Sequence, residues 1–276
     1  MPVAGIAPWH GPRIAPSMAT HGTGIDELLG SDLVDDPNRS AAEDPLRAEL
    51  TAQRRRRWGR QASLAAVTLG AVGGFLALTR VITGKRGNAF DRSVVRAMGQ
   101  VRHPVSNAVV QGITFFGSVA GAGGISLVSV YLARKRPRLA WQVVAGAVGG
   151  ITAELGFKRL YRRKRPTLLA HLEDVGSTSF PSGHSMAAAS LYLTLAFVAS
   201  RSRRLRMHRG ALLGGASALA ASVGATRIYL GVHWPTDVLG GLALGTAWAC
   251  VAEALYDLSG AERVEREAGA PALIAG

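Results

Sequence analysis

Apolar residues in this chain gather into long blocks that are separated by short clusters of basic residues. The first block, residues 62–83, is long enough to cross roughly 30 Å of hydrocarbon as a helix that rises about 1.5 Å per residue. Apolar blocks joined by basic loops are typical of helices that span a membrane. We therefore predict an all-α bundle of six transmembrane helices. The six blocks are residues 62–83, 105–133, 139–157, 185–200, 211–225 and 235–258.

A different pattern occupies residues 90–101, between the first two blocks. Apolar residues recur there at helical spacing and are opposed by polar residues that include Asp91. This period predicts an amphipathic helix, which we expect to lie in the membrane interface. Inside the spans, glycines such as Gly149 and Gly245 predict close helix packing, and Gly117 predicts a kink or a close contact.

The two ends of the chain differ from this membrane domain, residues 62–258. Residues 1–61 are rich in Pro, Gly, Asp and Arg and show no sustained period, so we expect a mostly disordered tail. They contain no apolar core of a signal peptide, and the first span should therefore direct the chain to the membrane. Residues 259–276 form a short C-terminal tail in this interpretation.

The composition adds a strong excess of positive charge. The chain carries 32 Lys and Arg against 18 Asp and Glu, which gives a formal net charge of +14. Nucleic-acid binding would use such charge, but the basic clusters flank the apolar blocks, and zinc-finger spacings and basic coiled coils are missing from the sequence. We therefore expect no nucleic-acid partner. The single cysteine, Cys250, cannot form an intramolecular disulfide.

The basic clusters also predict an orientation. Alternating spans place residues 54–60, 134–138 and 201–209 on one side, which the positive-inside rule assigns to the cytoplasm together with both termini. The opposite loops are basic too, above all at residues 158–165. The orientation is therefore secure only if that run has another role.

Three groups of polar residues lie at span ends on this opposite, outward side. In the first, Lys158 and Arg165 are about two helical turns apart, and Pro166 disfavours helical geometry at Arg165, so both cations can lean towards one anion. In the second, Ser182 is a natural N-cap of the next span and Gly183 allows close approach to the backbone. The amides at such a helix start attract anions, and His184 follows directly.

The third group combines a cation, an imidazole and a carboxylate. Arg227 supplies a bidentate anion donor, and His233 and Asp237 are four residues apart, so the carboxylate can reach back to the ring. Each group alone also fits an ordinary interpretation: a basic membrane-flanking loop, a capped helix with an incidental histidine, or interfacial snorkelling. Three groups on one membrane face favour a shared site.

These groups resemble the three signature motifs of the type 2 phosphatidic acid phosphatase (PAP2) superfamily. The similarity covers residues 62–258, and the third motif has Thr226 where the family has Ser, which keeps a hydroxyl. The first motif, Lys-x6-Arg-Pro, is matched by Lys158, Arg165 and Pro166. The second, Pro-Ser-Gly-His, is matched by residues 181–184, and the third, Ser-Arg-x5-His-x3-Asp, by Arg227, His233 and Asp237.

The resemblance implies a membrane phosphatase that hydrolyses a lipid or polyprenyl phosphate monoester or diphosphate without a metal or other cofactor. By similarity, His233 attacks phosphorus to form a phosphohistidine, Asp237 orients it, and His184 protonates the leaving alkoxide and then activates water. The phosphate would be held by Lys158, Arg165, Ser182, Gly183 and Arg227. Substrate binding would then account for the basic run 158–165, and the site should face outward.

Other functions remain open at this point. The same residues resemble the site of vanadate-dependent haloperoxidases, but those enzymes are soluble and the predicted spans argue against them. A transporter or a catalytically silent phospholipid-binding protein would keep the anion cradle, whereas the pair His184 and His233 favours turnover. The sequence leaves the choice among phosphatidic acid, phosphatidylglycerol phosphate and polyprenyl phosphates undecided, and also the oligomeric state.

Overall fold

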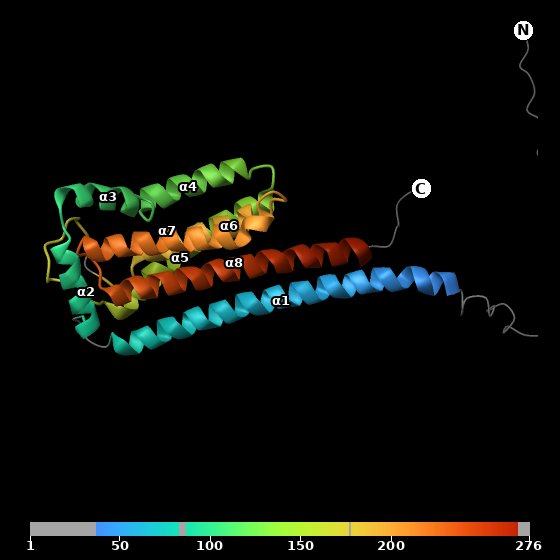
Figure 1. The fold of residues 1–276 in the computed structure, drawn as a ribbon, viewed down its shortest axis with the longest axis horizontal. Helices are drawn as coiled ribbons and strands as arrows, with labels where there is room; N and C mark the ends of the chain where they lie inside the picture. Colours follow the sequence, from blue (N-terminus) through green and yellow to red (C-terminus); the bar gives the residue numbers. More distant parts are fainter. Residues whose placement is uncertain (1–36, 83–86, 177, 270–276) are drawn as a thin grey trace, which may run out of the picture. The chain divides into compact units, whose positions relative to one another are not determined.

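The computed structural model describes residues 37–82, 87–176 and 178–269, and this part of the chain consists of helices and turns without a β-strand (Figure 1). The expected all-α class is thereby confirmed. The chain divides into two compact units, residues 1–56 and 57–276, and the site lies in the second. In order, the helices are α1 (Pro37–Val81), α2 (Ala89–Gln100), α3 (Pro104–Phe115), α4 (Val119–Leu132), α5 (Pro137–Tyr161), α6 (Gly183–Ala199), the short 3-10 helix η3 (Arg206–His208), α7 (Arg209–Tyr229) and α8 (Pro235–Gly269).

Helix α6 forms the centre of the second unit and packs against α5, α7 and α8. Its sequence is apolar on nearly every side, as expected for a helix surrounded by others. Glycines permit the short distances: a Cβ atom at Gly245 of α8 would lie 2.5 Å from the Met186 carbonyl oxygen, and one at Gly149 of α5 would overlap the Trp248 indole. The predicted close packing at these two glycines is confirmed.

Within the part of the chain that the structure describes, four helices are long and apolar enough to cross a membrane, or five if the pair α3 and α4 counts as one bent span. The expected number of six is not reached on this measure, because α6 has only 17 residues. The second expected span is broken: α3 ends at Phe115, the Ser118 hydroxyl caps α4 by accepting from the Gly121 amide at 3.0 Å, and the two axes differ by 44°. The kink predicted at Gly117 therefore lies at this break.

Two of the predicted boundaries differ from the structure. Helix α1 begins at Pro37, so residues 37–61 are helical where a disordered tail was expected. This segment is rich in Ala, Glu, Leu, Arg and Gln, which favour helices even without an apolar face. Helix α8 similarly continues past Leu258 to Gly269. Residues 1–36 and 270–276, the outer parts of the two expected tails, lie outside the described residues.

Helix α2 forms where the amphipathic pattern predicted it, but Asp91 does not belong to a solvated face. Its side chain is fully buried and pairs with Arg163 and Thr236. A carboxylate can be buried in this way because a buried cation and hydrogen bonds compensate its charge. One turn later on the same face, Val95 packs against Ile228 and Trp234. The face of α2 that carries Asp91 and Val95 is therefore buried in the protein, whereas Ser93 and Arg96 on the opposite side are exposed.

One arginine from each of the three basic clusters that predicted the orientation contacts the middle of α8. Arg60 and Arg201 both pair with the buried Glu253, and Arg138 donates to the Tyr256 carbonyl oxygen at 2.9 Å. Asp237 lies in the first turn of the same helix, more than four turns before Glu253. The basic clusters and the predicted catalytic residues therefore lie at opposite ends of the second unit.

Candidate active site

A cavity of about 620 Å³ lies among α4, α5 and α6 and the loops that precede α6 and α8. One part of its wall is charged, whereas the rest is formed by aliphatic side chains of α4 and α5. Ser182 and Asp237 do not line it. The other predicted site residues do, and they are Lys158, Arg165, Gly183, His184, Arg227 and His233. The three sequence motifs thus converge on one cavity.

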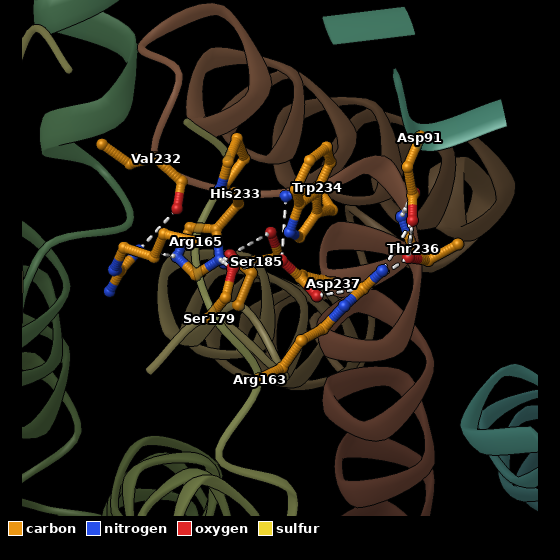
Figure 2. A network of polar contacts seen from close by, with 12 residues as sticks. Asp91, Arg163, Arg165, Ser179, Ser185, Val232, His233, Trp234, Thr236 and Asp237 are labelled. Carbon is orange, nitrogen blue, oxygen red and sulfur yellow. Dashed lines mark hydrogen bonds and ion pairs between the residues drawn. The ribbon is translucent and has the colours of Figure 1, made fainter. Parts of the chain in front are cut away.

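His233 lies in the short loop between α7 and α8 and is oriented from both sides (Figure 2). Its Nδ1 lies 3.6 Å from Asp237 Oδ2 and 3.4 Å from the Ser179 hydroxyl. Its Nε2 lies 3.1 Å from Arg165 Nη1. A guanidinium can only donate, so Nε2 must accept and the ring proton belongs on Nδ1, towards the carboxylate. The Nε2 lone pair is thus directed to the cation-lined side.

Burial lowers the pKa of His233 to about 4. The neighbouring Asp237 opposes this shift, while the positive charges of Arg165 and Arg227 add to it. Because the value lies well below neutral pH, His233 is uncharged in the pH range of most cells. An uncharged imidazole with an unprotonated Nε2 is the form that can act as a nucleophile.

Asp237 is held by a buried network that the sequence analysis missed (Figure 2). Arg163 is 2% exposed and donates to Asp237 Oδ1 at 2.6 Å and to Asp91 Oδ2 at 2.6 Å. The other Asp237 oxygen accepts from the Trp234 amide at 2.8 Å and from the Ser179 hydroxyl. Both oxygens of the Asp237 carboxylate are therefore held in place by hydrogen bonds.

This network changes the interpretation of the basic run 158–165. Arg163 was grouped there with substrate-binding cations, but it lies behind His233 and does not line the cavity. Nothing in the run distinguishes it from Arg162 or Lys164, because all three are basic residues between the same helices. The available signal was Asp91, a carboxylate in a membrane protein, which usually has a partner or a function.

The cavity cations have carboxylate partners that were also missed. Lys158 Nζ lies 2.5 Å from Glu154 Oε1, and the Glu154 carboxylate touches Gly183. Arg227 is 1% exposed and donates to Glu173 Oε2 at 2.5 Å, to Glu173 Oε1 at 3.2 Å and to the Thr114 hydroxyl at 2.9 Å. Arg165 donates instead to two backbone carbonyl oxygens, each at 2.6 Å.

Two hydroxyls of the motifs point away from the cavity. Ser182 is the N-cap of α6, as predicted, and its buried oxygen lies 2.9 Å from the Ser185 hydroxyl. Thr226 donates to the Val223 carbonyl oxygen within α7. The oxygen that replaces the family's Ser hydroxyl is thus used inside its own helix. The role of Ser182 as a phosphate ligand remains a prediction.

A family model described as the PAP2 superfamily matches residues 111–259, more than half of the chain. The chain belongs to the PAP2 superfamily. Among curated proteins, it is 35% identical to phosphatidylglycerophosphatase B of Bacillus subtilis (strain 168) over 182 residues, which cover 62% of this chain and 85% of that protein. It is 28% identical to decaprenylphosphoryl-5-phosphoribose phosphatase of Mycobacterium tuberculosis (strain ATCC 25618 / H37Rv) over 56% of this chain and 83% of that protein.

A solved structure agrees with the family assignment. A crystal structure of a transmembrane PAP2-type phosphatidylglycerolphosphate phosphatase from Bacillus subtilis superposes with a TM-score of 0.64 and 28% sequence identity. The match covers 72% of this chain and 98% of that one. The chain is therefore a PAP2-type phosphatase, and its apolar helices make it a membrane protein. Its PAP2 relatives are lipid phosphatases by name.

Proposed function

We propose that this PAP2 phosphatase hydrolyses a lipid or polyprenyl phosphate monoester or diphosphate through a phosphohistidine at His233, without a metal. The observation that carries the proposal is the shared cavity, in which two imidazoles and three cations adjoin a long aliphatic wall. A phosphate fits the charged part and an alkyl chain fits the aliphatic part. One substrate that is both a phosphate and a lipid uses the whole site.

The aliphatic wall also offers a route for the lipid chain. Val119, Leu127, Val148 and Ile151 line the cavity, and each is also at least 41% exposed. Apolar side chains of a membrane protein that are both exposed and cavity-lining place the opening towards the lipid. The substrate can therefore enter sideways between α4 and α5 with its headgroup moving towards His233.

The proposed first step forms a bond between His233 Nε2 and phosphorus while the bond from phosphorus to the leaving oxygen breaks. His184 donates its proton to that oxygen, so the leaving alcohol or phosphate departs with this oxygen protonated. Arg165 turns from Nε2 to the phosphate oxygens, where Lys158 and Arg227 spread the charge of the transition state. Asp237, held by Arg163, stabilises the Nδ1 proton as the ring becomes cationic.

In the second step, His184 accepts a proton from water, and the oxygen of that water attacks the phosphohistidine. The bond between phosphorus and Nε2 breaks, its electron pair returns to His233, and inorganic phosphate leaves. Both histidines then have their starting protonation, so the cycle balances. The Gly183 amide at the start of α6 adds a fixed dipole directed at the phosphate.

For the topology we propose six spans, with α3 and α4 as one bent span and the 17-residue α6 as a short one. The termini and the three basic clusters face the cytoplasm, the site faces outward, and α2 lies near the interface. Support comes from the three basic clusters, which gather at one end of the second unit, away from Asp237. A membrane-impermeant thiol reagent should label a cysteine placed at Asp174 in intact cells and should not label one at Arg204; the reverse pattern would overturn the orientation.

The function is tested by release of inorganic phosphate from purified protein in detergent with a chelator present. The substrates are phosphatidic acid, phosphatidylglycerol phosphate and polyprenyl mono- and diphosphates. We expect His233→Ala to lose at least about a thousandfold in rate, as nucleophile removal does in other enzymes. His208→Ala, a change at an exposed histidine of η3, should keep the rate.

Two results would contradict the proposal. Equal activity of His233→Ala and His208→Ala would remove His233 from the chemistry. Saturable binding of a lipid phosphate with no release by the unaltered chain would instead support a silent binding or transport protein that keeps the same anion cradle.

A further inference from the structure

A second cavity, of about 460 Å³, lies at the other end of the second unit. Arg209, at the start of α7, lines it, whereas Arg227, near the end of α7, lines the catalytic cavity. These residues are 18 positions apart, about 27 Å along a helix. The second cavity therefore cannot belong to the phosphatase site. Its lining residues are Arg60, Ser63, Leu64, Val67, Leu193, Phe197, Arg209, Leu213, Ser217, Thr246 and Cys250.

The charges around this cavity do not balance. Arg60 and Arg201 share two carboxylates: Arg60 pairs with Glu253 and Asp257, and Arg201 lies 2.6 Å from Glu253 Oε2 and 3.9 Å from Asp257 Oδ1. The third cation, Arg209, has no carboxylate within ion-pair distance among the side chains that the structure describes. Its guanidinium carbon lies 5.7 Å from the centre of the Phe197 ring. One positive charge at the cavity wall is therefore left for an external anion.

The remaining wall is suited to a hydrocarbon chain. Apart from the two arginines, the cavity wall consists mainly of apolar side chains, which include Val67 of α1, Phe197 of α6 and Leu213 of α7. Leu64 closes the inner side by packing against Leu193 and Phe197. The volume lies within the range of about 300–1,000 Å³ that is common for small-molecule sites. A soluble anion would use only the arginine end and leave this apolar surface uncovered.

Helix α1 leaves this space open because it packs loosely. A Cβ atom built on Gly70, Gly73 or Gly74 would meet no atom within 4 Å, in contrast to the tightly packed glycines of α5 and α8. Only 11% of the apolar window of α1 is buried. The ion pairs of Arg60 hold α1 against α8. Beside these ion pairs, the space between α1 and α7 forms the cavity.

We propose that this cavity binds an anionic phospholipid, with its phosphate on Arg209 and one acyl chain along Leu213 and Val67. Basic pockets between membrane helices on the cytoplasmic side recognise lipid headgroups through the same combination of charge and apolar contact. The site is separate from the proposed catalysis, since none of its residues lines the catalytic cavity. The lipid fills the gap beside α1 and so joins α1 to α7.

The probe is phosphatidylglycerol, an anionic lipid whose phosphate is a diester, with phosphatidylcholine as the neutral reference. The full chain is purified in detergent, incubated with either lipid in the presence of excess inorganic phosphate to fill the catalytic pocket, and examined by native mass spectrometry. We expect one phosphatidylglycerol to be retained per chain and little phosphatidylcholine. Equal retention of the two lipids would overturn the proposal, and so would retention of neither.

Arg209→Gln should weaken phosphatidylglycerol retention about fivefold, the effect of one arginine at a membrane surface. The matched control is Arg206→Gln, which removes the same charge from an exposed position three residues earlier, outside the cavity. Equal losses in the two variants would show general charge attraction and refute the site. Phosphatase activity of each variant reports whether it is folded.

If Arg209→Gln is inactive, Leu213→Trp replaces it as the test, because this change fills the cavity and keeps Arg209. It should lower phosphatidylglycerol retention while the phosphatase rate is kept. Unchanged retention in Leu213→Trp would refute the proposed place of the acyl chain.

Discussion

The Glu173 carboxylate accepts two hydrogen bonds from the guanidinium of Arg227. Arg227 is the most deeply buried cation of the catalytic cavity. A substrate phosphate that binds Arg227 must compete with this carboxylate, and the two anions repel each other if both stay. Glu173→Gln removes the negative charge and keeps the size and hydrogen-bonding capacity of the side chain. We therefore expect the variant to bind inorganic phosphate, the reaction product, more tightly.

The magnitude follows from the geometry of the pair. Two contacts of 2.5 and 3.2 Å to a buried guanidinium would suggest roughly 1.5–3 kcal/mol for a charge-assisted interaction. The Glu173 side chain is 35% exposed, so solvent screening reduces this to about 1 kcal/mol. That value corresponds to about a fivefold lower inhibition constant.

The assay is competitive inhibition of lipid-phosphate hydrolysis by inorganic phosphate at several substrate concentrations. Asp174→Asn is the matched control, because Asp174 lines the same cavity in the same loop and makes no ion pair with Arg227. Its inhibition constant should change by less than about twofold, as expected for an unpaired exposed charge. An unchanged or higher constant in Glu173→Gln would show that phosphate does not replace Glu173 at Arg227.

Three further predictions concern the residues around His233. Arg163→Met should destabilise the fold by about 3–5 kcal/mol because it leaves two buried carboxylates unpaired. The control, Arg162→Met at the exposed neighbour, should change stability by no more than about 0.5 kcal/mol. Equal midpoints of heat inactivation of the two variants in detergent would contradict this prediction. Because burial lowers the pKa of His233 to about 4, the acid limb of kcat/KM due to the nucleophile should lie near that value, and a nucleophile limb near 6.5 would contradict this. The same lowered pKa predicts that folding stability is lost as the pH falls from about 6.5 to about 4, since the unfolded histidine binds its proton first.

The sequence predicted the all-α class and the convergence of its three motifs well. Long apolar blocks leave few alternatives to membrane helices, because unpaired backbone groups are too unfavourable in hydrocarbon. Span ends at alternating faces then bring Lys158, His184 and His233 together without any knowledge of side-chain contacts. Periodicity and topology were sufficient for these features.

Features that depend on particular pairs of side chains were not predictable. Arg163 resembles its neighbours in sequence and differs only in reaching Asp91 and Asp237. The start of α1 at Pro37 was missed because residues 37–61 form a helix by intrinsic propensity and lack an apolar period. The break between α3 and α4 depends on the Ser118 cap. Composition does not show whether such a cap will interrupt a helix within a continuous apolar segment.

The contact between Gly183 and Glu154 links the shape of the second motif to the charge of the first. The space that a Cβ atom at position 183 would need is filled by the Glu154 carboxylate, which also holds Lys158. Even an alanine there would push that carboxylate aside and release the lysine ammonium into the cavity. Position 183 therefore controls two properties: how closely a ligand can approach the start of α6, and whether the Lys158 ammonium is paired with Glu154 or available to the ligand.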